Sequence, residues 1–277
     1  MKLKRKFNSL ACIVLCGSLL LCGCNSIGNA GSESSQTAQY ADQNFIKSLS
    51  TGLESRWKLG DKFDAEHAKN NTADVINVDE YTTLINTELS AINQYENAEF
   101  QDSKLQEKAL SYINALNDSL QALNYINSDP EKYITLWEGA YDSRSTLIKD
   151  FVENYGLTVD NKYQSTLNKF ISNAQAVSEK EKQKKMIDKL VNSMKFELAE
   201  DDYGYRTYTA TVQNNTGLNF STFDININLL DDDGTIVETD YDSISQFNNG
   251  STAKFKFSTD VNFSSTQVST NYYEISN

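Results

Sequence analysis

The feature that most constrains the fold is a change in the spacing of apolar residues near Lys195. Before this point, apolar side chains recur every three or four residues, which is the period of an amphipathic helix. From Phe196 onward they alternate with polar residues, which is the period of a strand with one solvated face. We therefore expect an α+β protein of two domains, a helical domain over residues 37–195 and a β domain over residues 196–277.

Five amphipathic helices are predicted in the first domain, and the clearest start is Asp129-Pro130-Glu131. It combines a capping carboxylate, a proline at the first helical position and an acid near the positive helix end. Gly156 is placed to end this helix. The first helix is expected over 37–58, with a loop over 60–76, and the third is expected to be capped at Asp102 or Ser103. Short connections predict an antiparallel bundle.

The second domain shows strict alternation in three runs, with turn signals between them. The apolar members of the runs are Tyr208, Ala210 and Val212; Phe223, Ile225, Ile227 and Leu229; and Ala253, Phe255 and Phe257. The turns contain Asn-, Asp- and Gly-rich segments at 214–217, 233–234 and 248–250, whose residues accept a positive φ. About seven short strands over about 80 residues predict an immunoglobulin-like β-sandwich.

The N-terminus has the order of an export signal: a basic start, an apolar run over 10–21 and a small-residue exit. The run is shorter than the roughly 20 residues that a transmembrane helix needs. The exit, Leu21-Cys22-Gly23-Cys24, resembles the lipobox of bacterial lipoproteins. This resemblance implies a signal peptide over 1–23, acylation of Cys24 as the new N-terminus, and attachment to the extracellular face of the cell membrane. A secretory signal without lipidation is the alternative. Polar residues over 24–36 predict a flexible tether.

Cysteine usage and charge exclude several classes of site and partner. All four cysteines lie at positions 12, 16, 22 and 24, so the chain beyond Cys24 has no disulfide, thiolate metal site or thiol nucleophile. Residues 1–23 hold four of the 25 basic residues and none of the 38 acidic ones, which leaves 21 basic against 38 acidic residues and a formal charge of −17. Such a surface repels nucleic acid. The single proline and the Asn-, Lys- and Tyr-rich composition indicate a low-GC, Gram-positive source.

Three segments of the β domain carry a family resemblance. They are Thr211–Thr216, Ile227–Val237 and Asn249–Phe255, and together they resemble the FxLYD domain. Leu229, Asp231 and the Asp-Gly turn match the family pattern, whereas Ile227 replaces its Phe and Leu230 replaces its Tyr. The resemblance implies a β-sandwich module found in bacterial surface lipoproteins, and it implies no activity.

Three motifs permit a chemical and a structural interpretation. Asp231-Asp232-Asp233-Gly234 lacks the alternating acids and distal Glu of a calcium loop, so a hairpin turn is favoured. His67, the only histidine, is expected to lie on the surface in a loop, because no motif supplies a triad around it. Trp57 and Trp137 could stack on sugar rings, but their helical spacing favours a core position. No catalytic residue, metal site or cofactor is predicted.

These observations predict a non-catalytic lipoprotein anchored to the membrane by lipid, an envelope interaction or binding module with a cell-wall or protein partner. The alternative is a wall-associated hydrolase or ligand-binding receptor with a pocket in the helical domain. A cleft lined by acids and an exposed Trp57 or Trp137 would favour that alternative.

Overall fold

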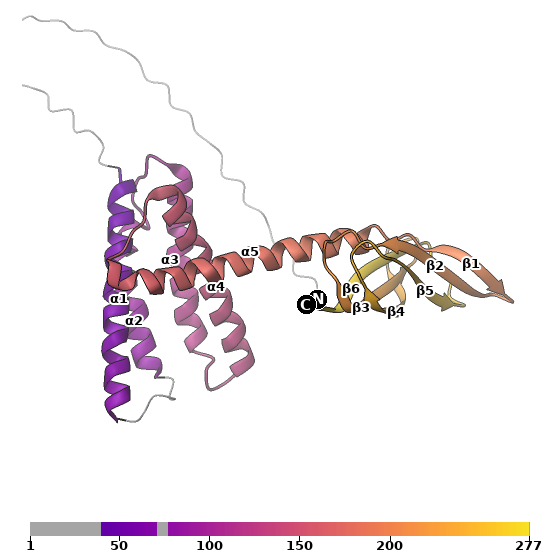
Figure 1. The fold of residues 1–277 in the computed structure, drawn as a ribbon, viewed down its shortest axis with the longest axis horizontal. Helices are drawn as coiled ribbons and strands as arrows, with labels where there is room; N and C mark the ends of the chain where they lie inside the picture. Colours follow the sequence, from indigo (N-terminus) through magenta and orange to yellow (C-terminus); the bar gives the residue numbers. More distant parts are fainter. Residues whose placement is uncertain (1–39, 71–76, 277) are drawn as a thin grey trace, which may run out of the picture. The chain divides into compact units, whose positions relative to one another are not determined.

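The computed structural model describes residues 40–70 and 77–276. The predicted signal peptide, Cys24 and the tether lie outside these residues. The first part of the described chain folds into helices (Figure 1), which are α1 (Asp42–Asn70), α2 (Val78–Ile92), α3 (Ser103–Leu123), α4 (Pro130–Tyr155) and α5 (Gln164–Asn192). Short 3-10 turns precede α3 (Asn93–Tyr95) and α5 (Asn161–Tyr163).

Three of the helices begin where a side chain satisfies the first free backbone N–H groups. Asn77 caps α2, Asp102 caps α3 and Asp129 caps α4, whose first residue is Pro130. Gly156 ends α4 with a φ of 72°, in the left-handed region that glycine adopts without strain. The predicted starts of α3 and α4 and the predicted end of α4 are therefore confirmed.

The predicted loop over 60–76 is wrong for residues 60–70, because α1 continues to Asn70. Residues 61–69 consist mainly of Lys, Glu, Asp and Ala, most of which form helices readily, and Gly60 alone does not break the helix. A 3.8 Å ion pair between Lys62 and Glu66, one turn apart, adds local support. His67 then contacts Glu80 of α2 at 3.0 Å, which ties this extension to the neighbouring helix.

Consecutive helices lie side by side in two pairs, α1 with α2 and α3 with α4, and α4 also packs on α5. Their apolar stripes form one core that includes Phe45, Leu53, Ile85, Tyr112 and Phe151. Gly52 permits the close approach of α1 to α2, because a Cβ there would lie 3.0 Å from Ala91 Cβ.

The second part of the described chain forms six strands in two antiparallel sheets. The strands are β1 (Glu197–Asp202), β2 (Tyr205–Gln213), β3 (Phe220–Leu230), β4 (Ile236–Phe247), β5 (Thr252–Thr259) and β6 (Ser265–Ile275), in the orders β1-β2-β5 and β4-β3-β6. The helical region followed by a β region confirms the α+β class. The described chain has one strand fewer than the predicted seven, because the turn signals mark fewer and longer strands of up to 12 residues.

The predicted alternation is confirmed in β3, whose buried residues Phe223, Ile225, Ile227 and Leu229 alternate with half-buried polar ones. The predicted turns are also confirmed. Asp231 Oδ1 accepts hydrogen bonds from the N–H groups of Asp233 and Thr235 between β3 and β4. Asn214, fully buried between β2 and β3, donates from Nδ2 to the carbonyl oxygens of Leu218 and Phe247.

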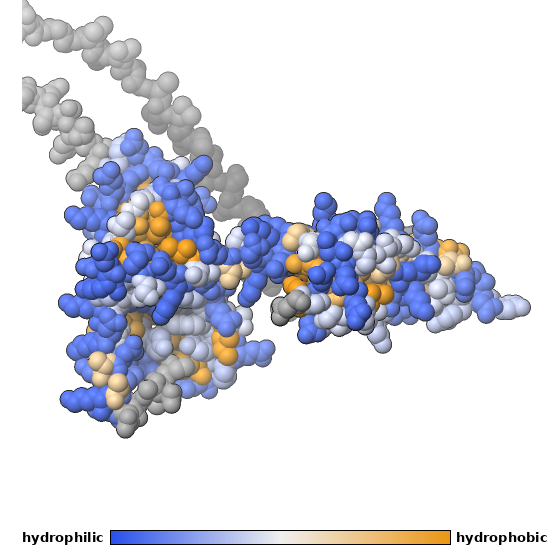
Figure 2. All heavy atoms as spheres, in the orientation of Figure 1, coloured by the Kyte–Doolittle hydropathy of each residue, from blue (hydrophilic) through white to orange (hydrophobic). Residues whose placement is uncertain are grey.

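The last turns of α5 belong to the core of the strands. Ile187, Leu190, Val191 and Met194 are buried in one apolar cluster with β2, β3 and β5 residues such as Val212, Phe223 and Phe255. In the view of Figure 2, apolar side chains gather over the end of α5 and the adjoining strands, whereas most of the remaining strand surface is hydrophilic. The sheets are thus covered in part by a helix that begins in the other core.

Candidate functional site: a groove between α5 and β6

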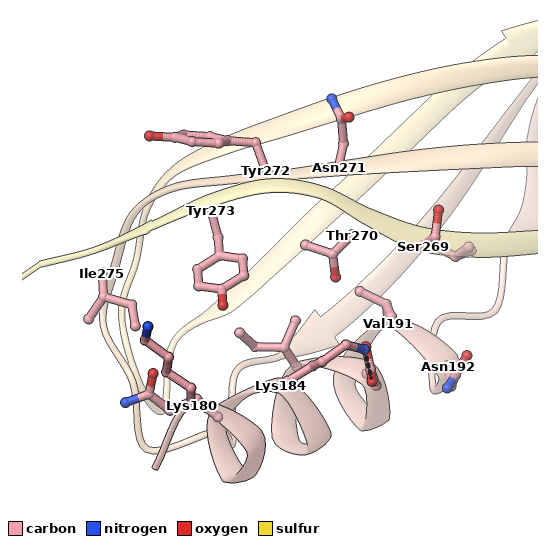
Figure 3. A pocket seen from close by; sticks show the side chains of 14 residues that line it. Lys180, Lys184, Val191, Asn192, Ser269, Thr270, Asn271, Tyr272, Tyr273 and Ile275 are labelled. Atoms are coloured by element: carbon pink, nitrogen blue, oxygen red, sulfur yellow. Dashed lines mark hydrogen bonds and ion pairs between the residues drawn. The ribbon is translucent and has the colours of Figure 1, made fainter. Parts of the chain in front are cut away.

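A surface groove of about 880 Å³ lies between the second half of α5 and the edge strand β6. Its apolar lining comes from Ile187, Val191, Val268 and Ile275. Figure 3 shows Thr270 and Tyr273 of β6 pointing toward α5, and Tyr272 and Asn271 pointing to the opposite side of the strand.

A β-bulge produces this distribution of side chains. The pairing of β6 with β3 passes from Thr270 opposite Ile225 to Tyr272 opposite Asp224, so Asn271 is the extra residue. A bulge shifts the alternation by one position. Thr270 and Tyr273 therefore face α5 although they are three residues apart, and both contribute polar atoms to an otherwise apolar wall.

The polar groups of the groove suit binding better than acid–base chemistry. The Lys184 ammonium forms a 2.7 Å ion pair with the Asp188 carboxylate, so this carboxylate already has a partner. The buried Oγ1 of Thr270 has no hydrogen-bond partner within the described residues, so a ligand group could supply one. An apolar hollow with a few fixed polar groups is the usual form of a ligand site. The groove can hold a ligand, and its Lys180 provides positive charge in an acidic protein, whereas the charge of Lys184 is offset by Asp188.

A second cluster, in the helical part, is almost completely buried. Glu88 of α2 accepts hydrogen bonds from Arg144 of α4 at 2.7 Å, Arg56 of α1 at 2.8 Å and the hydroxyl of Tyr112 of α3. The guanidinium carbon of Arg144 also lies 5.4 Å from the centre of the Phe170 ring of α5. One carboxylate therefore connects four helices directly.

The electrostatics of this cluster keep Glu88 ionised. Burial alone would raise the pKa of Glu88, but the charges of Arg144 and Arg56 and the Tyr112 hydroxyl together hold it below its usual 4.5. Burial, and then the Glu88 charge, raise the pKa of Tyr112, so its phenol stays protonated and donates. A buried carboxylate that is held by two guanidinium groups acts as a structural anchor. It has no access to a substrate.

The sequence contains a pattern that indicates this cluster, although no motif marks it. Glu88 lies three residues after Ile85 and four before Ile92, and so falls on the buried face of α2. Arg144 likewise lies four residues from both Ala140 and Ile148 of α4. A charge within an apolar stripe has to find a partner when it is buried. Charges of opposite sign within the apolar stripes of α2 and α4 therefore indicate an internal ion pair.

A hollow of about 630 Å³ lies between α3, α4 and α5. The alternative hypothesis, a hydrolase or ligand-binding receptor, predicted a pocket in this helical part. The carboxylates of Asp118, Asp142 and Glu181 line it. Trp57 and Trp137 do not reach it, because both pack against the helical core, Trp57 beside Tyr163 and Trp137 beside Tyr81. Both rings are half-buried at the edge of this core, so their predicted core position is confirmed only in part.

The other candidates from the sequence are the acidic turn at 231–233, His67 and the lipobox. The acids at 231–233 form the predicted hairpin turn, and in residues 40–70 and 77–276 no three His, Cys, Asp or Glu side chains are grouped to hold a metal. The loop predicted around His67 is wrong: the ring projects from α1 and is half-buried against Glu80. The lipobox residues Leu21, Cys22 and Gly23 and the acceptor Cys24 lie outside the described residues, so lipidation stays a prediction.

No protein-family model, curated protein or solved structure matches this chain. The resemblance to the FxLYD domain therefore stays a prediction. Of the helices in the described residues, none is both long enough and apolar enough to cross a membrane.

Proposed function

We propose that this protein is a non-catalytic lipoprotein that binds an envelope component while its acylated Cys24 holds it on the extracellular face of the cell membrane. The observation that carries the binding role is the α5–β6 groove, a ligand-sized hollow with a mixed apolar and polar lining and an unpartnered buried hydroxyl at Thr270. The Leu21–Cys24 exit after a short apolar run supports the anchor.

Two carboxylates that could act as a general acid or base are already paired with cations, which favours binding over catalysis. Glu88 is buried beneath two guanidinium groups, and Asp188 in the groove is paired with Lys184. A general acid or base has to reach its substrate within hydrogen-bonding distance. The one observation that favours a hydrolase or receptor acting from the helical domain is the hollow lined by Asp118, Asp142 and Glu181, and that function is the second candidate.

The finer architecture belongs to the same proposal: an antiparallel helical bundle followed by an immunoglobulin-like β-sandwich of the FxLYD type. Two three-stranded antiparallel sheets that share one apolar cluster support the sandwich. Asp242 of β4 accepts a hydrogen bond from the backbone N–H of Lys256 in β5 at 2.8 Å, which joins the edge strand of one sheet to the edge strand of the other.

The anchor is tested by replacing Cys24 with Ser. We expect the native protein to fractionate with membranes and to carry a diacylglyceryl group on residue 24 in mass spectrometry. The Cys24→Ser variant should move to the soluble fraction, whereas Cys22→Ser should stay with membranes. Membrane retention of Cys24→Ser, or a mature chain that starts at another residue, would disprove the anchor.

The binding role is tested with the soluble Cys24→Ser protein and envelopes from cells that lack the gene. Retention on these envelopes is expected, and Asn192→Trp, at an exposed position in the groove wall, should reduce it at least fivefold. Lys185→Trp places the same bulk at an exposed position of α5 outside the groove lining and serves as the control. Absence of retention would contradict a binding function, and equal retention of both variants would exclude the groove.

A further inference from the structure

The sheet β4-β3-β6 has an outer face that is built differently from the rest of the strand surface. Its side chains are the half-buried polar residues of β3 and their exposed partners on β4 and β6. We call six of these residues the amide–tyrosine face. They are Asn226, Asn228, Thr239, Tyr241, Gln267 and Tyr272.

Hydrogen bonds across all three strands fix the amides of this face. Asn228 of β3 accepts from the Thr239 hydroxyl of β4 at 2.8 Å and donates to Gln267 Oε1 of β6 at 3.3 Å. Asn226 donates to Asn271 of β6 at 3.4 Å. Because these amides are held in place by one another, they can bind a ligand with little further loss of side-chain entropy.

Two tyrosines flank the amides, and more than half of each is exposed to solvent. Tyr241 is 73% exposed and Tyr272 is 54% exposed. Tyr241 pairs with Asn226 and Tyr272 with Asp224, so the two residues lie about 10 Å apart across the sheet and about 7 Å apart along it. Figure 3 shows the Tyr272 ring on the side of β6 away from α5. Because Tyr272 is also among the residues that line the groove, the face adjoins the groove at this residue.

The chemistry of the amide–tyrosine face identifies its ligand. Aromatic rings offer flat apolar surfaces to C–H groups, and amides and hydroxyls bond to other hydroxyls. Strands β3, β4 and β6 contain no Lys or Arg to bind an anionic polymer, and Asp224, opposite Tyr272, adds a negative charge to the face. The exposed aliphatic side chains of this sheet, Ile236 and Val237, lie at the start of β4 and not among the amides, so the centre of the face lacks the dry apolar patch of a protein interface. The outer side of the other sheet differs, since β5 places Lys254 and Lys256 there. We infer that the amide–tyrosine face binds an uncharged glycan chain, whose sugar rings stack on Tyr241 and Tyr272 while the amides bond to its hydroxyls.

This inference goes beyond the groove, because it adds a second binding surface and names the ligand class of that surface. It rests on the proposed function for the existence of an envelope ligand, but it requires no lipid anchor. It also changes where sugar stacking takes place. Trp57 and Trp137, the aromatics with the largest rings, pack against the helical core, whereas two tyrosines of the β region are free to stack.

The test uses the full-length soluble Cys24→Ser protein and isothermal titration calorimetry with β-1,4-linked hexasaccharides of glucose, N-acetylglucosamine and mannose. At least one should bind. Tyr241→Ala and Tyr272→Ala should each weaken that binding at least tenfold, whereas Tyr241→Phe should keep it within about threefold because the ring remains. Tyr205→Ala is the matched control: Tyr205 is 56% exposed but belongs to β2 of the other sheet. Circular dichroism of each variant establishes that it is folded.

Two results would overturn the glycan face: no binding of any hexasaccharide, or binding that the paired Tyr241→Ala and Tyr272→Ala substitutions leave unchanged. Envelope retention separates this failure from failure of the proposed function. If retention persists without glycan binding and is lost after protease treatment of the envelopes, the partner is a protein; the binding role then stands and the glycan class falls. If retention is absent as well, both fail.

Discussion

At the scale of single residues, the Glu88 cluster shows how a charge is accommodated in a helical core. Its carboxylate is completely buried, and the side chains of Arg144 and Arg56 are 3% and 13% exposed. Removing one member of such a group costs more than the group contributes, because the remaining charges stay buried without compensation. Two guanidinium groups depend on one carboxylate here, so Glu88 is the most sensitive member.

We therefore expect Glu88→Gln to destabilise the protein by about 3–5 kcal/mol, the range for breaking a buried ion pair. Urea unfolding followed by circular dichroism measures this change. Glu153→Gln removes the carboxylate of the more exposed Lys149–Glu153 pair, at 2.7 Å, and should change stability by less than about 1 kcal/mol. Equal effects of the two substitutions would show that the buried cluster contributes nothing special.

The same residue gives a pH dependence with a defined sign. The pKa of Glu88 lies below 4.5 in the folded protein, so the unfolded chain binds its proton more readily. The stabilisation from this carboxylate is present above about pH 4.5 and is lost as the pH falls through the folded pKa. The difference in unfolding free energy between the native protein and Glu88→Gln should hence be constant from pH 5 to 8 and shrink below pH 4.5. A difference that grows on acidification would contradict this sign.

How much the sequence predicts at this scale depends on the kind of residue. Capping residues act on their own backbone, so Asp102, Asp129 and Gly156 were found from local pattern alone. Glu88 and Arg144 are 56 residues apart, and only the packing of α2 against the rest of the bundle shows that they meet. Tyr241 and Tyr272 belong to none of the alternating runs found in the sequence, and only the strand register places both on one face.

At the scale of elements, the helical period predicted the five helices, and alternation identified β2, β3 and β5 but not β1, β4 and β6. The end of α1 was misplaced because Gly60 and the asparagines at 70–71 were taken to outweigh the intervening helix formers. The strand number was overestimated because the strands are longer than expected, with up to 12 residues between the turns. Both errors reflect tertiary contacts, such as His67 with Glu80, that a local pattern does not contain.

Two helical glycines differ in a way that predicts opposite effects. A Cβ at Gly52 would meet Ala91 Cβ at 3.0 Å and the Glu88 carbonyl oxygen at 3.2 Å, whereas a Cβ at Gly139 would meet nothing within 4 Å. Gly52→Leu should therefore separate α1 from α2 and cost about 1–3 kcal/mol through overpacking. Gly139→Ala should stabilise the protein by about 0.5–1 kcal/mol through helix propensity. Thermal unfolding measures both, and a neutral Gly52→Leu would refute the close contact.

At the scale of the whole molecule, α5 links the two cores of the described chain. Its first half contributes Leu167 and Phe170 to the helical core, and its second half contributes Ile187, Leu190 and Val191 to the core of the strands. The apolar period of α5 predicted a helix but not this division, because a sequence stripe does not show which partner covers it. The predicted boundary between residues 195 and 196 therefore needs its own test.

Two fragments provide that test. Fragment 180–277 keeps the part of α5 that covers the strands, whereas fragment 196–277 exposes the apolar surface that Ile187, Leu190 and Val191 cover. Burying an aliphatic side chain contributes about 1.5–3 kcal/mol, so the shorter fragment should lose about 5 kcal/mol or more. That is comparable with the entire stability of a small domain. We expect a cooperative urea transition for 180–277 and none for 196–277. Equal stability of the two fragments would mean that the strands form a complete domain alone and that α5 merely adjoins them.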